Sequence, residues 1–220
     1  NYFYGFVTEG IFQSYKEIAE HALQTAGTDP TSSTAPGDIK FKDLNGDGVI
    51  NDADRTNIGN SNPTFTYGLT NTATYKNFEL TVFVQGSKGN KVLNFTRWYT
   101  EGGVSNGNYS NAVIGRWTAP GSSNTMPRLV LNDPNNNSRV SDRFVEDASY
   151  LRIKNIRIAY TLPAKMAEYL KLKRTQIYVS AQNLVTITDY SGFDPEVGGG
   201  VDYGFYPQAR TFLAGITVDF

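Results

Sequence analysis

The sequence predicts an all-β fold, an antiparallel transmembrane β-barrel to which this chain contributes one part. Three observations predict it. Five segments alternate apolar and polar residues with period two, long and short connections follow one another between them, and the last segment ends on Phe220. Strands with lipid on one side and water on the other alternate in this way, because successive side chains point to opposite faces.

The alternating segments define the expected strands. In residues 150–162 the apolar positions change phase at Lys154 and Asn155, which predicts a β-bulge. A shorter strand is expected at residues 1–6, which makes about six strands in all. The remaining segments are residues 64–75, 78–86, 177–187 and 211–220.

The connections favour a barrel over a soluble sandwich. The links at 76–77 and 163–174 are short, whereas those at 7–63, 88–149 and 188–207 are long. Outer-membrane barrels have short periplasmic turns and long external loops, so the three long links are expected to be extracellular loops. A soluble protein that ends on an edge strand usually ends on polar residues, which discourages aggregation. The aromatic end of this chain is typical of barrels instead.

Composition excludes several classes of function. The net charge is -1 and basic residues are not clustered, so no nucleic-acid partner is expected. There is no cysteine and one histidine, His21, which leaves almost no material for thiolate sites or histidine-based catalysis. The acid pairs Glu146/Asp147 and Asp194/Glu196 lie at junctions of loops and strands, in no recognisable site. We therefore expect that the chain is not an enzyme.

Residues 43–54 match the spacing of a calcium-binding loop. Oxygen-bearing side chains occur at loop positions one, three, five and twelve, Gly48 occupies position six, and Ile50 can fix the loop to a core. Position twelve is an aspartate where EF-hands have glutamate, and a turn follows in place of a helix. A single structural calcium ion is expected, and the alternative is an Asx-rich turn without metal. The predicted ligands are the side chains of Asp43, Asn45, Asp47 and Asp54 and the carbonyl of Val49.

Several longer motifs resemble the C-terminal region of SusC/RagA-type TonB-dependent transporters, and together they cover nearly the whole chain. One departure is Ala209, where the family pattern leads us to expect a proline. The matching stretches are residues 36–55, 58–68, 77–86, 150–156, 160–163, 190–196 and 206–216.

The resemblance implies a barrel of about 22 strands, of which this chain supplies about the last six. It implies a plug domain and an energy-coupling segment, both outside this chain, and a place in the outer membrane of Bacteroidota. It also implies a SusD-like surface lipoprotein as partner, energy delivered through TonB, and oligosaccharides or peptides as cargo.

The sequence leaves one alternative of a different class, a soluble, calcium-containing β-sandwich that binds carbohydrate. The two predictions differ in what covers the apolar side of the strands. In a barrel that side meets lipid, and the strands must close against the remainder of the barrel, since an unpaired backbone group in lipid costs several kcal/mol. In a sandwich the apolar sides of two sheets pack against each other.

Overall fold

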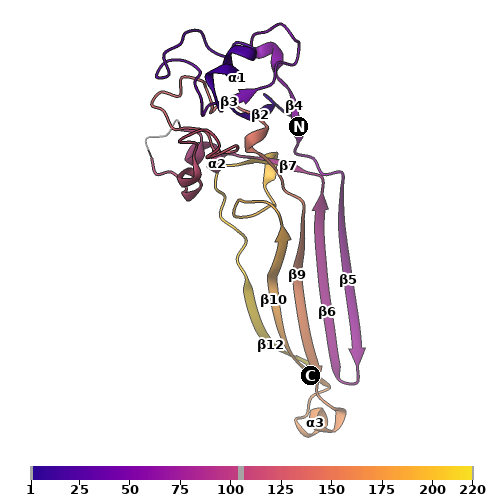
Figure 1. The fold of residues 1–220 in the computed structure, drawn as a ribbon. Coiled ribbons are helices and arrows are strands. Elements are labelled where there is room, and N and C mark those ends of the chain that lie inside the picture. The colour runs from indigo at the N-terminus through magenta and orange to yellow at the C-terminus, as the bar shows by residue number, and fades with distance from the viewer. Residues whose placement is uncertain (1, 104–106, 220) are drawn as a thin grey trace. The chain divides into compact units, whose positions relative to one another are not determined.

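A computed structural model describes residues 2–103 and 107–219, which form two compact units (Figure 1). We call the first the loop unit; it contains the described residues of 2–62, 91–146 and 197–205. We call the second the sheet unit; it contains residues 63–90, 147–196 and 206–219. The predicted terminal Phe220 lies outside the described residues.

The sheet unit is one antiparallel sheet with the strand order β12-β10-β9-β6-β5. All five alternating segments form strands within three residues of their expected bounds in the described part of the chain. Strands of about 9–11 residues are long enough to cross a bilayer when tilted, and all five reach that length. The strands are β5 (Phe65–Tyr75), β6 (Phe78–Lys88), β9 (Tyr150–Thr161), β10 (Arg174–Thr188) and β12 (Thr211–Asp219).

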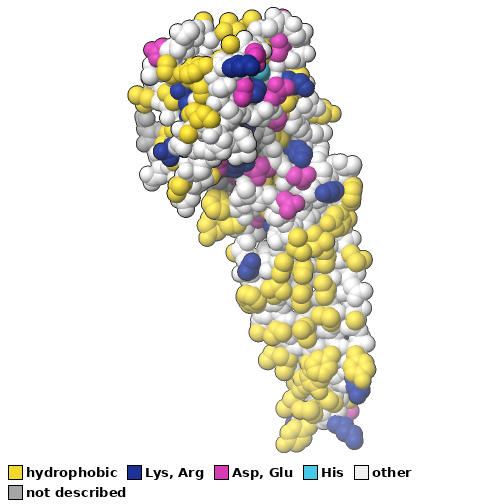
Figure 2. Space-filling view, viewed as in Figure 1, with side chains coloured by type: hydrophobic (Ala, Val, Ile, Leu, Met, Phe, Trp, Pro, Cys, Tyr) yellow, Lys and Arg dark blue, Asp and Glu magenta, His cyan; other side chains and the backbone are white. Residues whose placement is uncertain are grey.

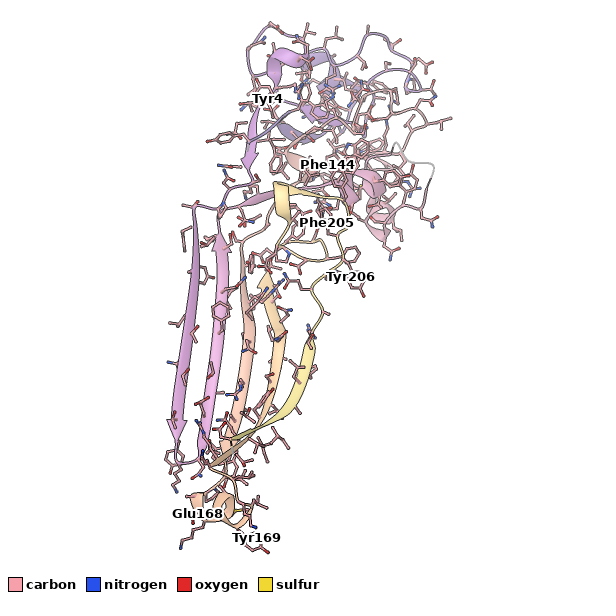
Figure 3. The ribbon with its side chains drawn as sticks, turned by 180° about the vertical axis from the view of Figure 1, so that it is seen from behind. Tyr4, Phe144, Glu168, Tyr169, Phe205 and Tyr206 are labelled. Atoms are coloured by element: carbon pink, nitrogen blue, oxygen red, sulfur yellow. The ribbon has the colours of Figure 1, made fainter. Side chains whose placement is uncertain are left out.

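Both short connections lie at the same end of this sheet. A tight turn with Lys76 at φ 52° joins β5 to β6. The link from β9 to β10 carries the helix α3 (Ala164–Tyr169), which begins directly after Pro163, a residue suited to a helix start. Figure 3 shows Glu168 and Tyr169 of α3 projecting beyond the strand ends.

The bulge predicted at Lys154 and Asn155 is confirmed. On β6, the neighbours Phe83 and Val84 pair with Asn155 and Ile153, so that Lys154 is the extra residue. An inserted residue shifts the alternation by one position. The apolar side chains before and after the bulge therefore face the same side of the sheet.

The sixth predicted strand exists but does not join this sheet. It is β1 (Tyr2–Gly5), which pairs with β4 (Thr56–Asn60) in a separate two-stranded sheet of the loop unit. The expectation that it adds a sixth strand to the long sheet is therefore wrong for the described residues. Four residues extend only about 13 Å, too little to cross a bilayer.

Short elements around a small apolar core make up the loop unit. Phe6, Ile39, Phe41 and Ile50 form this core. The remaining strands of the unit are β2 (Thr8–Ile11), β3 (Ile39–Phe41), β7 (Lys91–Asn94), β8 (Val145–Asp147) and β11 (Val201–Asp202). The helices are α1 (Tyr15–Glu20), α2 (Phe95–Glu101), η1 (Asp52–Asp54), η2 (Asn111–Gly115), η3 (Asp142–Phe144) and η4 (Gly198–Gly200).

Helices give no membrane span here. Within residues 2–103 and 107–219, none of them has both the length and the apolar character needed to cross a bilayer.

Candidate functional site

The sheet unit has one apolar and one polar face. Residues that pair across neighbouring strands share a face, so the register identifies each face row by row. One row of partners runs across all five strands and is apolar throughout: Tyr75, Phe78, Tyr160, Ile177 and Ile216. A second row is also apolar throughout: Ala73, Leu80, Ile158, Val179 and Ala214.

The apolar face is exposed in this chain. Leu69, Ile187 and Phe212 leave 67%, 63% and 71% of their surfaces uncovered. Figure 2 shows hydrophobic side chains covering one side of the sheet. A sandwich formed within this chain would bury these side chains against a second sheet, and no second sheet covers them in the described residues. An exposed apolar area of this extent is expected where a surface meets lipid or another protein.

The opposite face of the sheet is polar and contains charges. Arg157 of β9 donates to Glu79 Oε1 of β6 at 3.0 Å and to Gln176 Oε1 of β10 at 2.8 Å. The Arg157 guanidinium also lies 4.6 Å from the ring centre of Tyr178. Such side chains suit a face turned toward water, as on the inside of a transport barrel.

A buried ion-pair network lies on the polar face near the start of β9. We call it the Arg152 network. The Arg152 side chain is 3% exposed and donates to Asp194 Oδ1 at 2.8 Å and to Thr186 Oγ1 at 2.8 Å. Arg152 Nη1 also donates to Glu196. Lys154, the bulge residue, is 3.2 Å from the same Glu196 carboxylate.

Further hydrogen bonds complete the Arg152 network. Glu196 accepts from Gln85 Nε2 at 2.7 Å and from the Tyr150 hydroxyl at 2.8 Å. Burial acts to raise the pKa of Asp194, but the backbone N–H groups of Glu196 and Gln208, together with Arg152, outweigh it and leave the pKa below its usual value. The Asp194 carboxylate is therefore held ionised beside Arg152, and the ion pairs and hydrogen bonds of the network hold the chain after β10 against the sheet.

The network was not predicted from the sequence as a unit. Asp194 and Glu196 form an acid pair within the 190–196 motif and Arg152 lies in the 150–156 motif, but neither motif shows that these residues contact one another. Arg152 lies 42 and 44 residues from these two partners, so that local periodicity does not join them. The one available signal was the alternation of β9, which places Arg152 and Arg157 opposite the apolar positions.

Residues 43–54 form a compact loop held by backbone hydrogen bonds. Asp43 accepts from the N–H groups of Gly46 at 2.7 Å and Gly48 at 2.8 Å. Asp54, which is fully buried, accepts from the N–H groups of Leu44 and Asn51 at 2.8 and 2.9 Å. The carboxylates at both ends of the loop thus point inward.

Two more predicted ligands lie at the exposed tip of the loop. Asn45 Oδ1 accepts from Asp47 N at 3.0 Å, and Asp47 Oδ1 accepts from Val49 N at 2.9 Å. Ile50 is 5% exposed in the core of the loop unit, so it fixes the loop as expected. Across the described residues, however, no group of three or more His, Cys, Asp and Glu side chains is close enough to hold a metal ion.

Individual known proteins, rather than a family model, show which family this chain belongs to. No family model matches the chain. TonB-dependent receptor P3 of Formosa agariphila is 34% identical over 99% of the chain, and TonB-dependent receptor SusC of Bacteroides thetaiotaomicron is 30% identical over 84%. The chain spans 22% and 18% of the lengths of these two relatives.

Solved structures agree with these relatives. The RagAB peptide transporter superposes with a TM-score of 0.79 at 25% identity, and the open-open RagAB peptide importer with 0.72 at 26%. Both matches cover all of this chain and 22% of the solved chain. The two-faced sheet and these matches define part of an all-β transmembrane barrel. The chain is a portion of a SusC-type TonB-dependent transporter.

Proposed function

We propose that this chain forms part of the wall of an outer-membrane importer that takes up oligosaccharides or peptides with energy delivered through TonB. The observation that carries the proposal is the sheet with an exposed apolar face and a charged opposite face. The names of the relatives support the TonB-dependent class, and the RagAB structures concern a peptide importer.

The strands of the importer continue on both edges of this sheet. β5 and β12 are the outer strands of the described sheet, so each has one row of backbone groups directed away from it. In lipid these groups must pair, which requires the remainder of the barrel. The plug domain and the TonB contact belong to that remainder in this proposal.

The long connections form the external surface. Residues 7–63, 88–149 and 188–207 all leave the sheet at the end opposite the 76–77 turn, because the strands are antiparallel. We infer that they are extracellular loops and that a SusD-like surface lipoprotein binds them. The Arg152 network supports this role, since it orders the start of the last loop beside the polar face.

We also propose that residues 43–54 bind one structural calcium ion. Calcium takes six to eight oxygen ligands, and Asp43, Asn45, Asp47, Asp54 and the Val49 carbonyl are the oxygens of this loop. Each carboxylate oxygen that accepts one N–H retains a second lone pair for an ion. The interaction between Asp43 and Asp54 is among the causes that hold the Asp54 pKa low, which supports a common position for the two carboxylates.

Uptake measurements test the importer. Cells with and without the transporter gene receive labelled oligosaccharides and labelled oligopeptides, each with TonB present or deleted. We expect uptake of one class, which requires both the gene and TonB. If uptake of both classes is the same in cells with and without the gene, the proposed function is refuted. A control strain that carries the importer without its lipoprotein measures how far the partner contributes.

A further inference from the structure

The loop unit contains a cavity of about 630 Å³ that none of the features above uses. Its floor is apolar, formed by Ile11, Ile39 and Met126, which are 5%, 2% and 7% exposed. Gly10 and Gly115 leave its walls without side chains, and a Cβ placed at either position would meet nothing within 4 Å. The rest of the lining includes the charged side chains of Arg97 and Glu101 and the polar side chains of Thr8, Asn124 and Thr125. A cavity of this size that combines apolar surface with charged and polar groups is typical of a small-ligand site.

One wall of the cavity is Arg143, whose charge is poorly compensated. Its side chain is 9% exposed. Nη2 donates to Met126 Sδ at 3.0 Å, and a thioether is a weak acceptor. The nearest carboxylate oxygen, Glu101 Oε2, is 3.8 Å from Nη2, which is beyond hydrogen-bond distance. Nη1 is buried and has no hydrogen-bond partner in the part of the chain that the structure describes.

Glu101 is not free to compensate Arg143, because Arg97 already holds it. Arg97 donates to Glu101 through Nε at 3.2 Å and Nη2 at 3.0 Å, and to Glu146 through Nη1 at 2.8 Å. Arg97 therefore has hydrogen bonds to two carboxylates, whereas Arg143 interacts with Glu101 and Asp133 only through longer-range charge attraction. A buried donor left without an acceptor costs about 1–3 kcal/mol, more when it is charged.

Arg143 is nevertheless held in place and charged. Its guanidinium carbon lies 4.9 Å from the ring centre of Phe144, the buried residue labelled in Figure 3. Burial lowers the pKa of Arg143 to about 10, which still leaves it protonated at neutral pH. The cavity thus contains a fixed cation next to an apolar floor.

We propose that this cavity binds a carboxylate group of the cargo, with Arg143 as its partner. A guanidinium matches the two oxygens of a carboxylate, and the apolar floor accommodates the carbon skeleton beside it. Nη1 is covered in the present structure, so binding includes a small turn of the guanidinium toward the cavity. Two sources have this chemistry, the C-terminus of a peptide and the carboxylate of an acidic sugar.

The proposal rests on the importer function only in taking the carboxylate to belong to cargo. It is tested by calorimetric titration of the whole detergent-solubilised transporter without its lipoprotein. The probes are Ala-Ala-Leu with a free C-terminus and its C-terminal amide, and digalacturonate and its neutral methyl ester. In at least one pair we expect the acid to bind about tenfold or more tightly than its neutral form, as for one hydrogen bond to a charged group. The pair that shows the preference identifies the source.

Two cavity variants, each with a matched control, test whether the preference for the acid arises in this cavity. Arg143→Gln should abolish it, while Arg116→Gln, the same change at an exposed arginine outside the cavity, should retain it. Gly115→Leu should fill the cavity and abolish binding without altering Arg143, whereas Gly198→Leu, another position with open space, should not. If Arg143→Gln does not fold, the glycine pair decides.

Three results overturn the proposal: no binding of either acid, equal binding of acid and neutral forms, or a preference that survives both cavity variants. These results are distinct from failure of the importer. A carboxylate preference in a transporter that shows no TonB-dependent uptake would refute the importer and leave the site standing, and the reverse result would do the opposite.

Discussion

Replacing Arg152 with methionine removes a cation that contacts both Asp194 and Glu196. Arg152 is almost fully buried, and its loss leaves Asp194 with only backbone donors. Glu196 keeps Lys154 at 3.2 Å and is 20% exposed, so its penalty is smaller. Breaking a buried ion pair by removing one partner costs about 3–5 kcal/mol. The chain after β10 should therefore detach from the sheet far more often in Arg152→Met than in the wild type.

Hydrogen exchange measures this opening directly. The N–H groups of Glu196 and Gln208 donate to Asp194 at 2.9 and 3.1 Å and are protected while the network is intact. Mass spectrometry of peptides covering 189–196 and 206–210 should show exchange about 100- to 5,000-fold faster in Arg152→Met, at ~1.4 kcal/mol per tenfold. Peptides from β5 and β6 should change much less.

A matched control separates the network from a general effect of charge. Arg157→Met removes an arginine from the same strand and face, but Arg157 is 27% exposed, so about 1 kcal/mol or less is expected. The triple variant R152M/D194N/E196Q should recover much of the protection, because it removes the uncompensated carboxylates as well. The reasoning would be refuted if Arg152→Met left the exchange rates unchanged, or if the triple variant exchanged faster than Arg152→Met.

Three further predictions concern the apolar face and the calcium loop. Leu69→Lys should cost about 2–4 kcal/mol near the bilayer midplane and reduce folded transporter in isolated outer membranes, whereas Thr70→Lys on the polar face should have little effect; equal losses would contradict the face assignment. Calcium should raise the melting temperature of the solubilised wild type and not of Asp54→Ala; a rise in both would exclude residues 43–54 as the site. Although burial opposes it, hydrogen bonds from Asn51 and Leu44 lower the Asp54 pKa. The stabilisation that ionised Asp54 gives the loop is therefore complete above pH 3.8, the ordinary pKa of an aspartate, and is lost as the pH falls through the lower pKa of the folded protein. Without calcium, the loop should become sensitive to protease below that folded-state pKa and stay resistant between pH 5 and 7.

The sequence was most informative where burial on one side repeats over many residues. β5 and β6 were predicted to within two residues at each end, and the phase change at Lys154 was found as a bulge. β10 begins earlier than expected, at Arg174, because its first residues are polar on both faces and carry no apolar alternation. Alternation therefore predicts the part of a strand that meets lipid better than its ends.

The loop unit could not be predicted in the same way. Strands such as β3 and β11 have three and two residues, too few for any periodicity. The Arg143 cavity combines residues from β2, β3, α2 and the 124–126 segment, which only the tertiary fold brings together. Within the proposed calcium site the spacing predicted the loop and the inward carboxylates, and occupancy by an ion stays a prediction.

The rows of the apolar face also set how deep the protein sits in its membrane. From Phe65 to Tyr75 the face extends about 34 Å along β5 at ~3.4 Å per residue. A strand tilt of about 40° reduces this to a vertical height of about 26 Å, which matches the ~25 Å apolar band of outer-membrane barrels. The aromatic row with Tyr75, Phe78 and Tyr160 marks one rim of this band, and the Phe78 and Tyr160 rings lie 4.8 Å apart there. A thicker host bilayer would have to thin locally around these strands.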